Sequence, residues 1–216
     1  MSIYRQESDE RTVRRFEAFS DIVIGFSLAQ LGVSLTIPAH GIDLYLNPEW
    51  LISFVWAFAN ICAMWWFHHR IFASIFVPRT IPTLLNFVWL AVVVLCVYFT
   101  EVTVHLADDP VTWRTYFALF ALAYGLLAAQ YYVGVRLGGT SLPPEMLLTA
   151  RRQRSFMTLW TGAFTVCTLF VLLLPWGPGI GPSLSITFTL ATIASALMAR
   201  YYRKLRERSA AQRPSA

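Results

Sequence analysis

The sequence predicts an all-α membrane protein, with six transmembrane helices in a single domain that covers residues 1–216. Of its 216 residues, 56% are hydrophobic and only 13% are charged, whereas a soluble domain carries roughly 25% charged residues. The mean hydropathy is +0.54. The 8 Trp residues fit a chain that meets the bilayer surface, where Trp gathers. These observations exclude a soluble globular domain.

Six apolar runs follow one another along the chain. Each run is continuous rather than alternating, which favours helices over barrel strands. Each is also long enough to cross a hydrocarbon core of roughly 30 Å. The predicted helices span residues 14–38, 49–76, 81–106, 113–137, 154–175 and 182–202.

Pro and Gly separate these runs, because both residues end helices or form turns. In chain order the separators are Pro38, Asn47-Pro48, Pro78 with Pro82, Gly138-Gly139, and the segment from Pro175 to Gly179.

The basic residues predict the orientation of the six helices. If both termini are cytosolic, all of the 17 basic residues except Arg114 lie in cytosolic segments, as the positive-inside rule requires. The opposite loops carry Asp43, Glu49, Asp108 and Asp109. We therefore expect a multi-pass protein of the cell inner (plasma) membrane with cytosolic termini. The basic tail at 200–213 is interpreted as a contact with lipid headgroups, and no nucleic-acid partner is expected.

Polar residues from three predicted helices fall at one depth near the cytosolic side. Ionisable groups inside a membrane are costly and are therefore candidates for function. The two readings are a hydrogen-bond network that joins three helices and a metal or proton site. The network is favoured, because adjacent His residues point about 100° apart on a helix and no H-E-x-x-H motif occurs. The residues at this depth are Arg15, Ser20, Asp21, His68, His69 and Asn86.

Motifs for catalysis and for a carbonyl-lined ion filter do not occur in the sequence. A membrane enzyme that uses His68 and His69 is disfavoured, because no nucleophile, second carboxylate or metal-ligand spacing accompanies them. We therefore expect no enzymatic activity, no metal site and no cofactor.

The first helix carries small residues at seven-residue intervals, which keeps them near one face. Ser20, Ser27 and Ser34 form one series, and Gly25 and Gly32 form another. One reading is close helix packing through small residues. The other is that this helix, with Gln30 on it, faces water across a symmetry axis. A channel would then need several copies of the chain, and the residues alone leave the two readings open.

Four segments resemble the transmembrane protein 175 family of potassium channels. The segment Arg15 to Asp21 matches the family's Arg-x-x-x-Phe-Ser-Asp motif, in which Phe19 is the Phe. The segment Trp65 to Phe72 resembles its Trp-x-Asn-His-His-Arg-Leu-Phe motif, with Phe67 in place of the Asn. Weaker similarities lie at Leu84-Leu85-Asn86 and Ala123-Tyr124-Gly125.

The resemblance implies a homotetramer whose first helices line a central pore for K⁺, with a hydrophobic constriction and no filter loop. The constriction maps to Phe26, where a smaller aliphatic residue is usual. Gln30 likewise stands where an apolar residue is expected. The implied pore-lining residues are Ile22, Phe26, Ala29, Gln30 and Val33. The implied network that holds the pore helix is Arg15, Phe19, Ser20, Asp21, His68, His69 and Asn86.

The leading functional hypothesis is therefore a potassium-permeable cation channel. The alternative is a membrane protein of the same fold that conducts protons, conducts cations without selectivity, or serves as a non-conducting scaffold.

Overall fold

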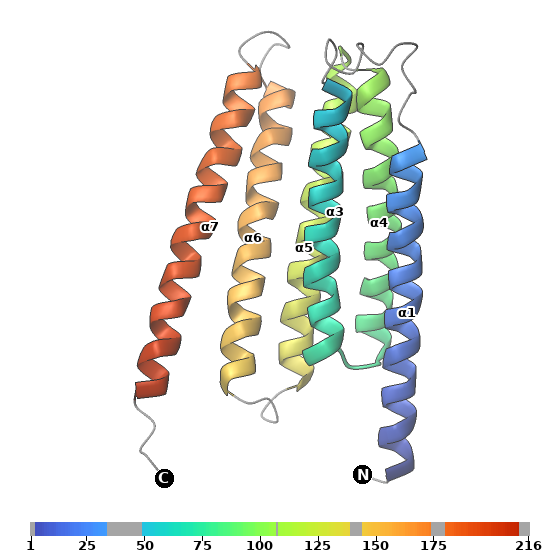
Figure 1. The fold of residues 1–216 in the computed structure, drawn as a ribbon, viewed down its shortest axis with the longest axis vertical. Coiled ribbons are helices and arrows are strands. Elements are labelled where there is room, and N and C mark those ends of the chain that lie inside the picture. Colours follow the sequence, from blue (N-terminus) through green and yellow to red (C-terminus); the bar gives the residue numbers. More distant parts are fainter. Residues whose placement is uncertain (1–2, 34–48, 107, 139–143, 174–179, 212–216) are drawn as a thin grey trace.

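A computed structural model describes residues 3–33, 49–106, 108–138, 144–173 and 180–211. Within these ranges the chain forms six long helices and no strand, so the predicted all-α fold is confirmed. The helices are α1 (Ile3–Val33), α3 (Glu49–Ser74), α4 (Thr80–His105), α5 (Pro110–Gly138), α6 (Pro144–Leu173) and α7 (Ile180–Ala211). They run side by side in an up-and-down bundle (Figure 1).

Three helices extend beyond their predicted apolar runs. α1 begins at Ile3 rather than near residue 14, α6 begins at Pro144 rather than near 154, and α7 continues to Ala211 rather than 202. Hydropathy marks only the part of a helix that suits hydrocarbon, whereas a helix can continue through polar residues into the membrane surface. The predicted ends at residues 34–38 and 174–175 lie outside the described residues.

Four of the described helices are long and apolar enough to cross a bilayer. These segments are Asp9–Val33 of α1, Thr80–His105 of α4, Pro110–Leu137 of α5 and Glu145–Leu173 of α6. The other two helices, α3 with 26 residues and α7 with 32 residues, lie alongside them in the same bundle (Figure 1).

The start of α1 and the end of α7 lie at the same end of the bundle (Figure 1). Because successive helices alternate in direction, this end also holds the α3–α4 turn with Arg79 and the last turn of α5 with Arg136. We call it the basic end. Arg114, the one basic residue predicted on the other side, lies near the start of α5 at the opposite end.

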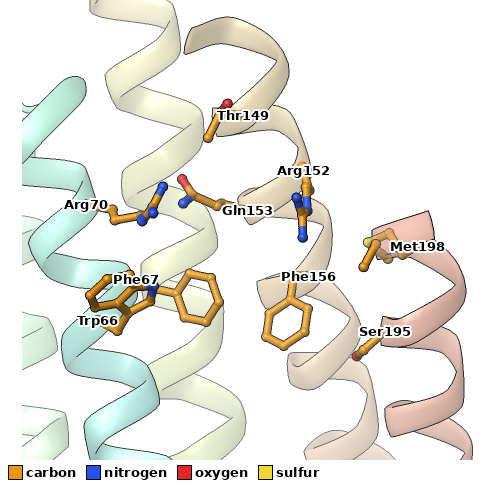
Figure 2. Close-up of a pocket in the computed structure, with 10 residues that line it drawn as sticks. Trp66, Phe67, Arg70, Thr149, Arg152, Gln153, Phe156, Ser195 and Met198 are labelled. Carbon is orange, nitrogen blue, oxygen red and sulfur yellow. The ribbon is translucent and has the colours of Figure 1, made fainter. Parts of the chain in front are cut away.

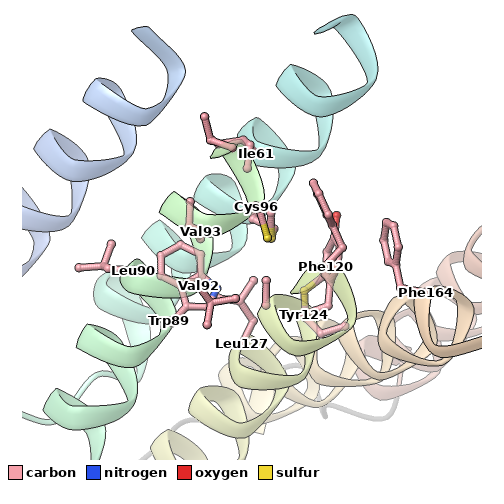
Figure 3. Close-up of a cluster of buried hydrophobic side chains, with 14 of the residues drawn as sticks. Ile61, Trp89, Leu90, Val92, Val93, Cys96, Phe120, Tyr124, Leu127 and Phe164 are labelled. Atoms are coloured by element: carbon pink, nitrogen blue, oxygen red, sulfur yellow. The ribbon is translucent and has the colours of Figure 1, made fainter. Parts of the chain in front are cut away.

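The core of the bundle surrounds α5, which packs against α3, α4 and α6. Large aromatic side chains from α4, α5 and α6 meet there, among them Trp89, Phe120 and Phe164 (Figure 3). α1 packs mainly on α3 and α4, and α7 packs mainly on α6. The first and last helices therefore form the two edges of the protomer (Figure 1).

Polar contacts and one glycine hold α5 close to α3. The Tyr124 hydroxyl donates to Asn60 Oδ1 over 3.0 Å, and the Tyr131 hydroxyl donates to the Phe67 carbonyl over 2.8 Å. A Cβ atom at Gly134 would lie 2.9 Å from the carbonyl oxygen of Ile75, closer than real Cβ atoms come to other atoms. Only glycine lets the two backbones approach this closely.

Two polar side chains stabilise helix ends far from the basic end. Asp109 precedes α5 and accepts hydrogen bonds from the backbone N–H groups of Val111 and Thr112. The Thr112 hydroxyl also donates to Asp109, over 2.8 Å. This is a helix N-cap, followed by Pro110 at the first helical position. The Arg114 Nε donates to the Val171 carbonyl over 3.0 Å, at the last turn of α6 where carbonyls lack helical partners.

Candidate functional site

A buried group of three polar side chains joins α1, α3 and α4. Asn86 Nδ2 donates to Ser20 Oγ over 3.2 Å, and Asn86 Oδ1 lies 2.6 Å from His68 Nε2. An amide oxygen can only accept, so His68 carries its proton on Nε2. The His68 ring stacks on Trp89 with centroids 4.2 Å apart. We call Ser20, His68 and Asn86 the buried triad, because all three side chains are inaccessible to solvent.

Two further pairs connect α1 to α3 beside the buried triad. Trp65 Nε1 donates to Asp21 Oδ1 over 2.8 Å. His69 Nδ1 lies 2.9 Å from Glu17 Oε1. Glu17 and Asp21 are four residues apart on α1, and Trp65 and His69 are four residues apart on α3. Because the two helices are antiparallel, the spacings match and the four side chains pair in order.

The predicted polar network is thus divided into a buried triad and two outer pairs. Ser20, His68 and Asn86 are brought together, whereas Asp21 and His69 each bind another partner. Glu17 and Trp65 were not predicted as members, although their four-residue spacings to Asp21 and His69 were a signal available in the sequence.

The remaining two members of the predicted network lie apart from these hydrogen bonds. Arg15 is exposed and forms no hydrogen bond or ion pair with any described residue. Phe19 is half-exposed and makes an edge contact with Phe87, with ring centroids 6.0 Å apart. Topology gives the depth of a residue in the membrane but not the direction in which its side chain points, which explains why Arg15 was included.

Within the described ranges, no group of three or more His, Cys, Asp and Glu side chains is arranged to hold a metal ion. His68 and His69 point to different neighbours, as their adjacent positions on α3 require. The Nδ1 atom of His68 is buried without a hydrogen-bond partner.

The opposite side of α1 is exposed. The side chains of Ile22, Phe26 and Val33 are 56%, 73% and 78% accessible in the single chain. Ala29 and Gln30 are exposed on the same side. These five residues are the predicted pore-lining set, and we call them the α1 face.

The two small-residue series of α1 lie on different sides of the helix. Ser20 and Ser27 are buried, and their hydroxyls donate to the carbonyls of Phe16 and Val23 over 2.8 and 2.9 Å. Gly25 and Gly32 are exposed, with open space where a Cβ atom would stand. The serines therefore serve packing within the protomer. Ser34 lies outside the described residues.

The last helix has hydroxyl groups that could also line a polar path. Thr192 Oγ1 donates to the Phe188 carbonyl, and Ser195 Oγ donates to the Ala191 carbonyl, each over 2.8 Å. Both hydroxyls return to the preceding turn, so neither requires water as a partner.

A protein-family comparison gives one match. A family model described as "Endosomal/lysosomal potassium channel TMEM175" matches residues 15–96, which include the buried triad and the α1 face. No curated protein sequence is significantly similar to the chain.

Two solved structures have the same fold. One is a variant of the potassium channel MtTMEM175 in complex with a nanobody-MBP fusion protein. It has a TM-score of 0.66 and 18% identity, over 88% of this chain and 93% of that one. The other is a lysosomal potassium-selective channel TMEM175 homolog from Chamaesiphon minutus. It has a TM-score of 0.65 and 18% identity, over 89% of this chain and 98% of that one. The family model confirms the predicted resemblance to the TMEM175 family over residues 15–96. The solved structures show that the fold is shared over most of the chain.

Proposed function

We propose that this chain is a potassium-permeable cation channel, formed when four copies place their α1 helices around a common axis. The observation that carries the proposal is the α1 face. It is exposed in the protomer, although it belongs to an apolar helix whose other side is firmly bound to α3 and α4. The family match over residues 15–96 supports the same assignment.

The composition of the α1 face favours a pore axis over contact with lipid. Gln30 is exposed there and has no hydrogen-bond partner among the described residues. A primary amide facing hydrocarbon would lose its hydrogen bonds to water at a cost of several kcal/mol (~4–8 kcal/mol for transfer to an alkane). Gly25 and Gly32 lie on the same side and would let neighbouring copies of α1 approach closely.

The buried triad explains how α1 keeps this orientation. A rotation of α1 about its own axis would break the hydrogen bond between Asn86 and Ser20 and bury polar atoms without partners. Each such unsatisfied group costs roughly 1–3 kcal/mol. The triad and the two outer pairs thus act as structural supports, and none of them needs to contact the ion.

Permeation would depend on a hydrophobic constriction rather than on a carbonyl filter. Phe26 is the largest side chain of the α1 face, and a ring of four would exclude water and raise the barrier to a hydrated cation. K⁺ loses water more readily than Na⁺, so a dry constriction favours K⁺ without binding it. Ile22 and Gln30 lie four residues on either side of Phe26 and share its direction.

The proposed channel lies in the cell inner (plasma) membrane with both termini in the cytosol. The basic end supports this orientation, because arginines collect on the cytosolic side of membrane proteins.

Flux through reconstituted liposomes tests the function. We expect K⁺ influx down its gradient, a smaller Na⁺ influx, and little proton flux under the same conditions. Tetrameric protein that carries protons or equal amounts of both cations would favour the alternative conductances. Tetrameric protein that carries none of these ions would favour a scaffold.

A further inference from the structure

A cavity at the basic end, distant from the α1 face, has the features of a ligand site. It lies between α3, α6 and α7 and has a volume of about 250 Å³. A second cavity of about 420 Å³ adjoins it and shares Trp66, Arg70, Thr149 and Gln153. Volumes of this order are found for small-molecule pockets (roughly 300–1,000 Å³).

Positively charged side chains line the first cavity. Arg70 and Arg152 line it, and no acidic residue does. Arg70 lies over the Trp66 ring, 5.1 Å from its centroid, which leaves its N–H groups available. Glu145 and His69 line the second cavity, which Arg70 also lines, and the His69 ring is paired with Glu17. Arg152 lines the first cavity alone.

The wall of the first cavity also contributes an amide group, that of Gln153. Gln153 is only 8% exposed, yet it forms no hydrogen bond with any described residue. Figure 2 shows the Gln153 amide and the Arg70 guanidinium directed toward each other across the opening. The amide atoms of Gln153 are not among the enclosed polar atoms without partners in the described residues, so they are open to the cavity and available to a ligand or to water.

The lining of the cavity is polar near the end of the bundle and apolar deeper in the bundle. Thr149, Gln153 and Arg70 lie toward the end of the bundle, whereas the Phe67 and Phe156 rings lie about a turn deeper (Figure 2). Those two rings are stacked, with centroids 5.1 Å apart. A ligand that satisfies both levels has an anionic head and an apolar body.

We propose that this cavity binds the phosphate headgroup of an anionic phospholipid, with an acyl chain against the aromatic floor. Guanidinium groups suit phosphate because they donate in a planar fork to two of its oxygens. The Gln153 amide would donate to a third oxygen. A soluble phosphate could use the same donors but would leave the apolar floor uncovered, so the lipid is favoured as the source.

Binding can be measured on the purified full-length protein without any flux assay, so its result is independent of the channel proposal. The protein is incubated with phosphatidylglycerol or phosphatidylcholine, and retained lipid is counted by native mass spectrometry. We expect retention of phosphatidylglycerol in preference to phosphatidylcholine. In Arg152→Gln and Arg70→Gln the retained phosphatidylglycerol should fall roughly fivefold or more.

Arg151→Gln is the matched control. It removes the same charge from the neighbouring position of α6, but Arg151 lines neither cavity. The control should retain lipid as the unmodified protein does. An equal loss in all three variants would show diffuse attraction to basic residues and would overturn a defined site, as would unchanged retention in Arg152→Gln and Arg70→Gln.

Inorganic phosphate distinguishes the two sources of the anion. We expect phosphatidylglycerol, but not inorganic phosphate, to raise the melting temperature of the protein, with the increase lost in Arg152→Gln. Equal stabilisation by inorganic phosphate would overturn the lipid assignment.

Discussion

At the scale of single residues, the adjacent histidines of α3 have separate roles. His68 is buried, stacks on Trp89 and lies 2.6 Å from Asn86. His69 is partly exposed and pairs with Glu17. The sequence places both at the same depth, so it predicts that they meet α1 and α4. Their different partners depend on how α3 is rotated, which composition and spacing do not determine.

Asn86→Ala should destabilise the protein more than Asp21→Ala. Loss of the Asn86 amide leaves the buried His68 Nε2 without a partner, at roughly 1–3 kcal/mol, whereas the Ser20 hydroxyl still donates to the Phe16 carbonyl. Asp21 is exposed, so solvent can replace it as the acceptor for Trp65. Thermal unfolding in detergent measures the difference. Equal melting temperatures in both variants would show that the buried triad contributes little to stability.

Phe26→Ala should raise flux and lower discrimination between K⁺ and Na⁺. The smaller side chain widens the proposed constriction and lets water enter, which removes the dehydration barrier. Bilayer current under bi-ionic conditions measures both quantities.

Phe58→Ala is the control for this variant. It removes the same exposed ring type from α3 rather than from the α1 face, and it should leave flux and ion preference unchanged. If Phe26→Ala remains tetrameric and conducts as before, Phe26 does not line the pore.

At the scale of helices, apolar runs and their Pro and Gly boundaries were sufficient to predict six elements in the right order. Helix ends beyond the hydrocarbon were not predictable from hydropathy, as the polar starts of α1 and α6 show. The sequence also could not predict which side chains pair between helices where the pairing depends on how each helix is rotated about its own axis. The Glu17–His69 and Asp21–Trp65 pairs are an exception, because their equal spacings on antiparallel helices suggest the match.

Gly134→Ala should destabilise the contact between α5 and the end of α3. The new Cβ atom would lie 2.9 Å from a backbone carbonyl that cannot easily move, and overpacking of this kind costs roughly 1–3 kcal/mol. Gly162→Ala on α6 is the matched control, because no heavy atom lies within 4 Å of the added Cβ atom. It should be neutral or stabilising by up to about 1 kcal/mol, since alanine favours helix. Similar melting temperatures for the two variants would contradict this contact.

Asp109→Ala should lower the melting temperature at neutral pH, because α5 loses its N-cap. Hydrogen bonds from the Thr112 hydroxyl and from the backbone N–H of Val111 lower the pKa of Asp109 below its usual 3.8. A carboxylate whose pKa is lower in the folded state adds stability above its unfolded pKa and loses it as pH falls through the folded pKa. The difference in melting temperature between the two proteins should therefore shrink below about pH 4. A difference that stays constant down to pH 3 would show that the carboxylate charge is not involved.

At the scale of the whole molecule, the protomer has two unlike edges. On α7, the Thr192 and Ser195 hydroxyls donate hydrogen bonds to backbone carbonyls of the same helix. On α1, the Gln30 amide is exposed. The sequence singled out Gln30 on the first helix, in the reading in which that helix faces water. It did not predict the cavity at the basic end, because that site requires α3, α6 and α7 to meet at a level that no local pattern specifies.

Cysteine modification should distinguish the two edges in the assembled channel. Ala29→Cys on the α1 face should react with a water-soluble thiol reagent and lose flux, because the added group narrows the pore. Ala196→Cys, exposed on α7, should show no loss of flux on treatment. Both variants need a background in which the half-buried Cys62 is replaced, since Cys96 and Cys167 are buried. A loss of flux only in Ala196→Cys would assign the pore to α7.

The division of α1 into a bound side and an open side also bears on how such a protein can change over evolutionary time. Residues that hold the helix in the protomer, such as Ser20 and Ile24, differ from those that would meet the ion, such as Phe26 and Gln30. A substitution at Phe26 or Gln30 disturbs no contact in the protomer core. Selectivity and conductance can therefore diverge by single mutations while the stability of each subunit is retained, so one scaffold can give rise to channels with different permeation properties.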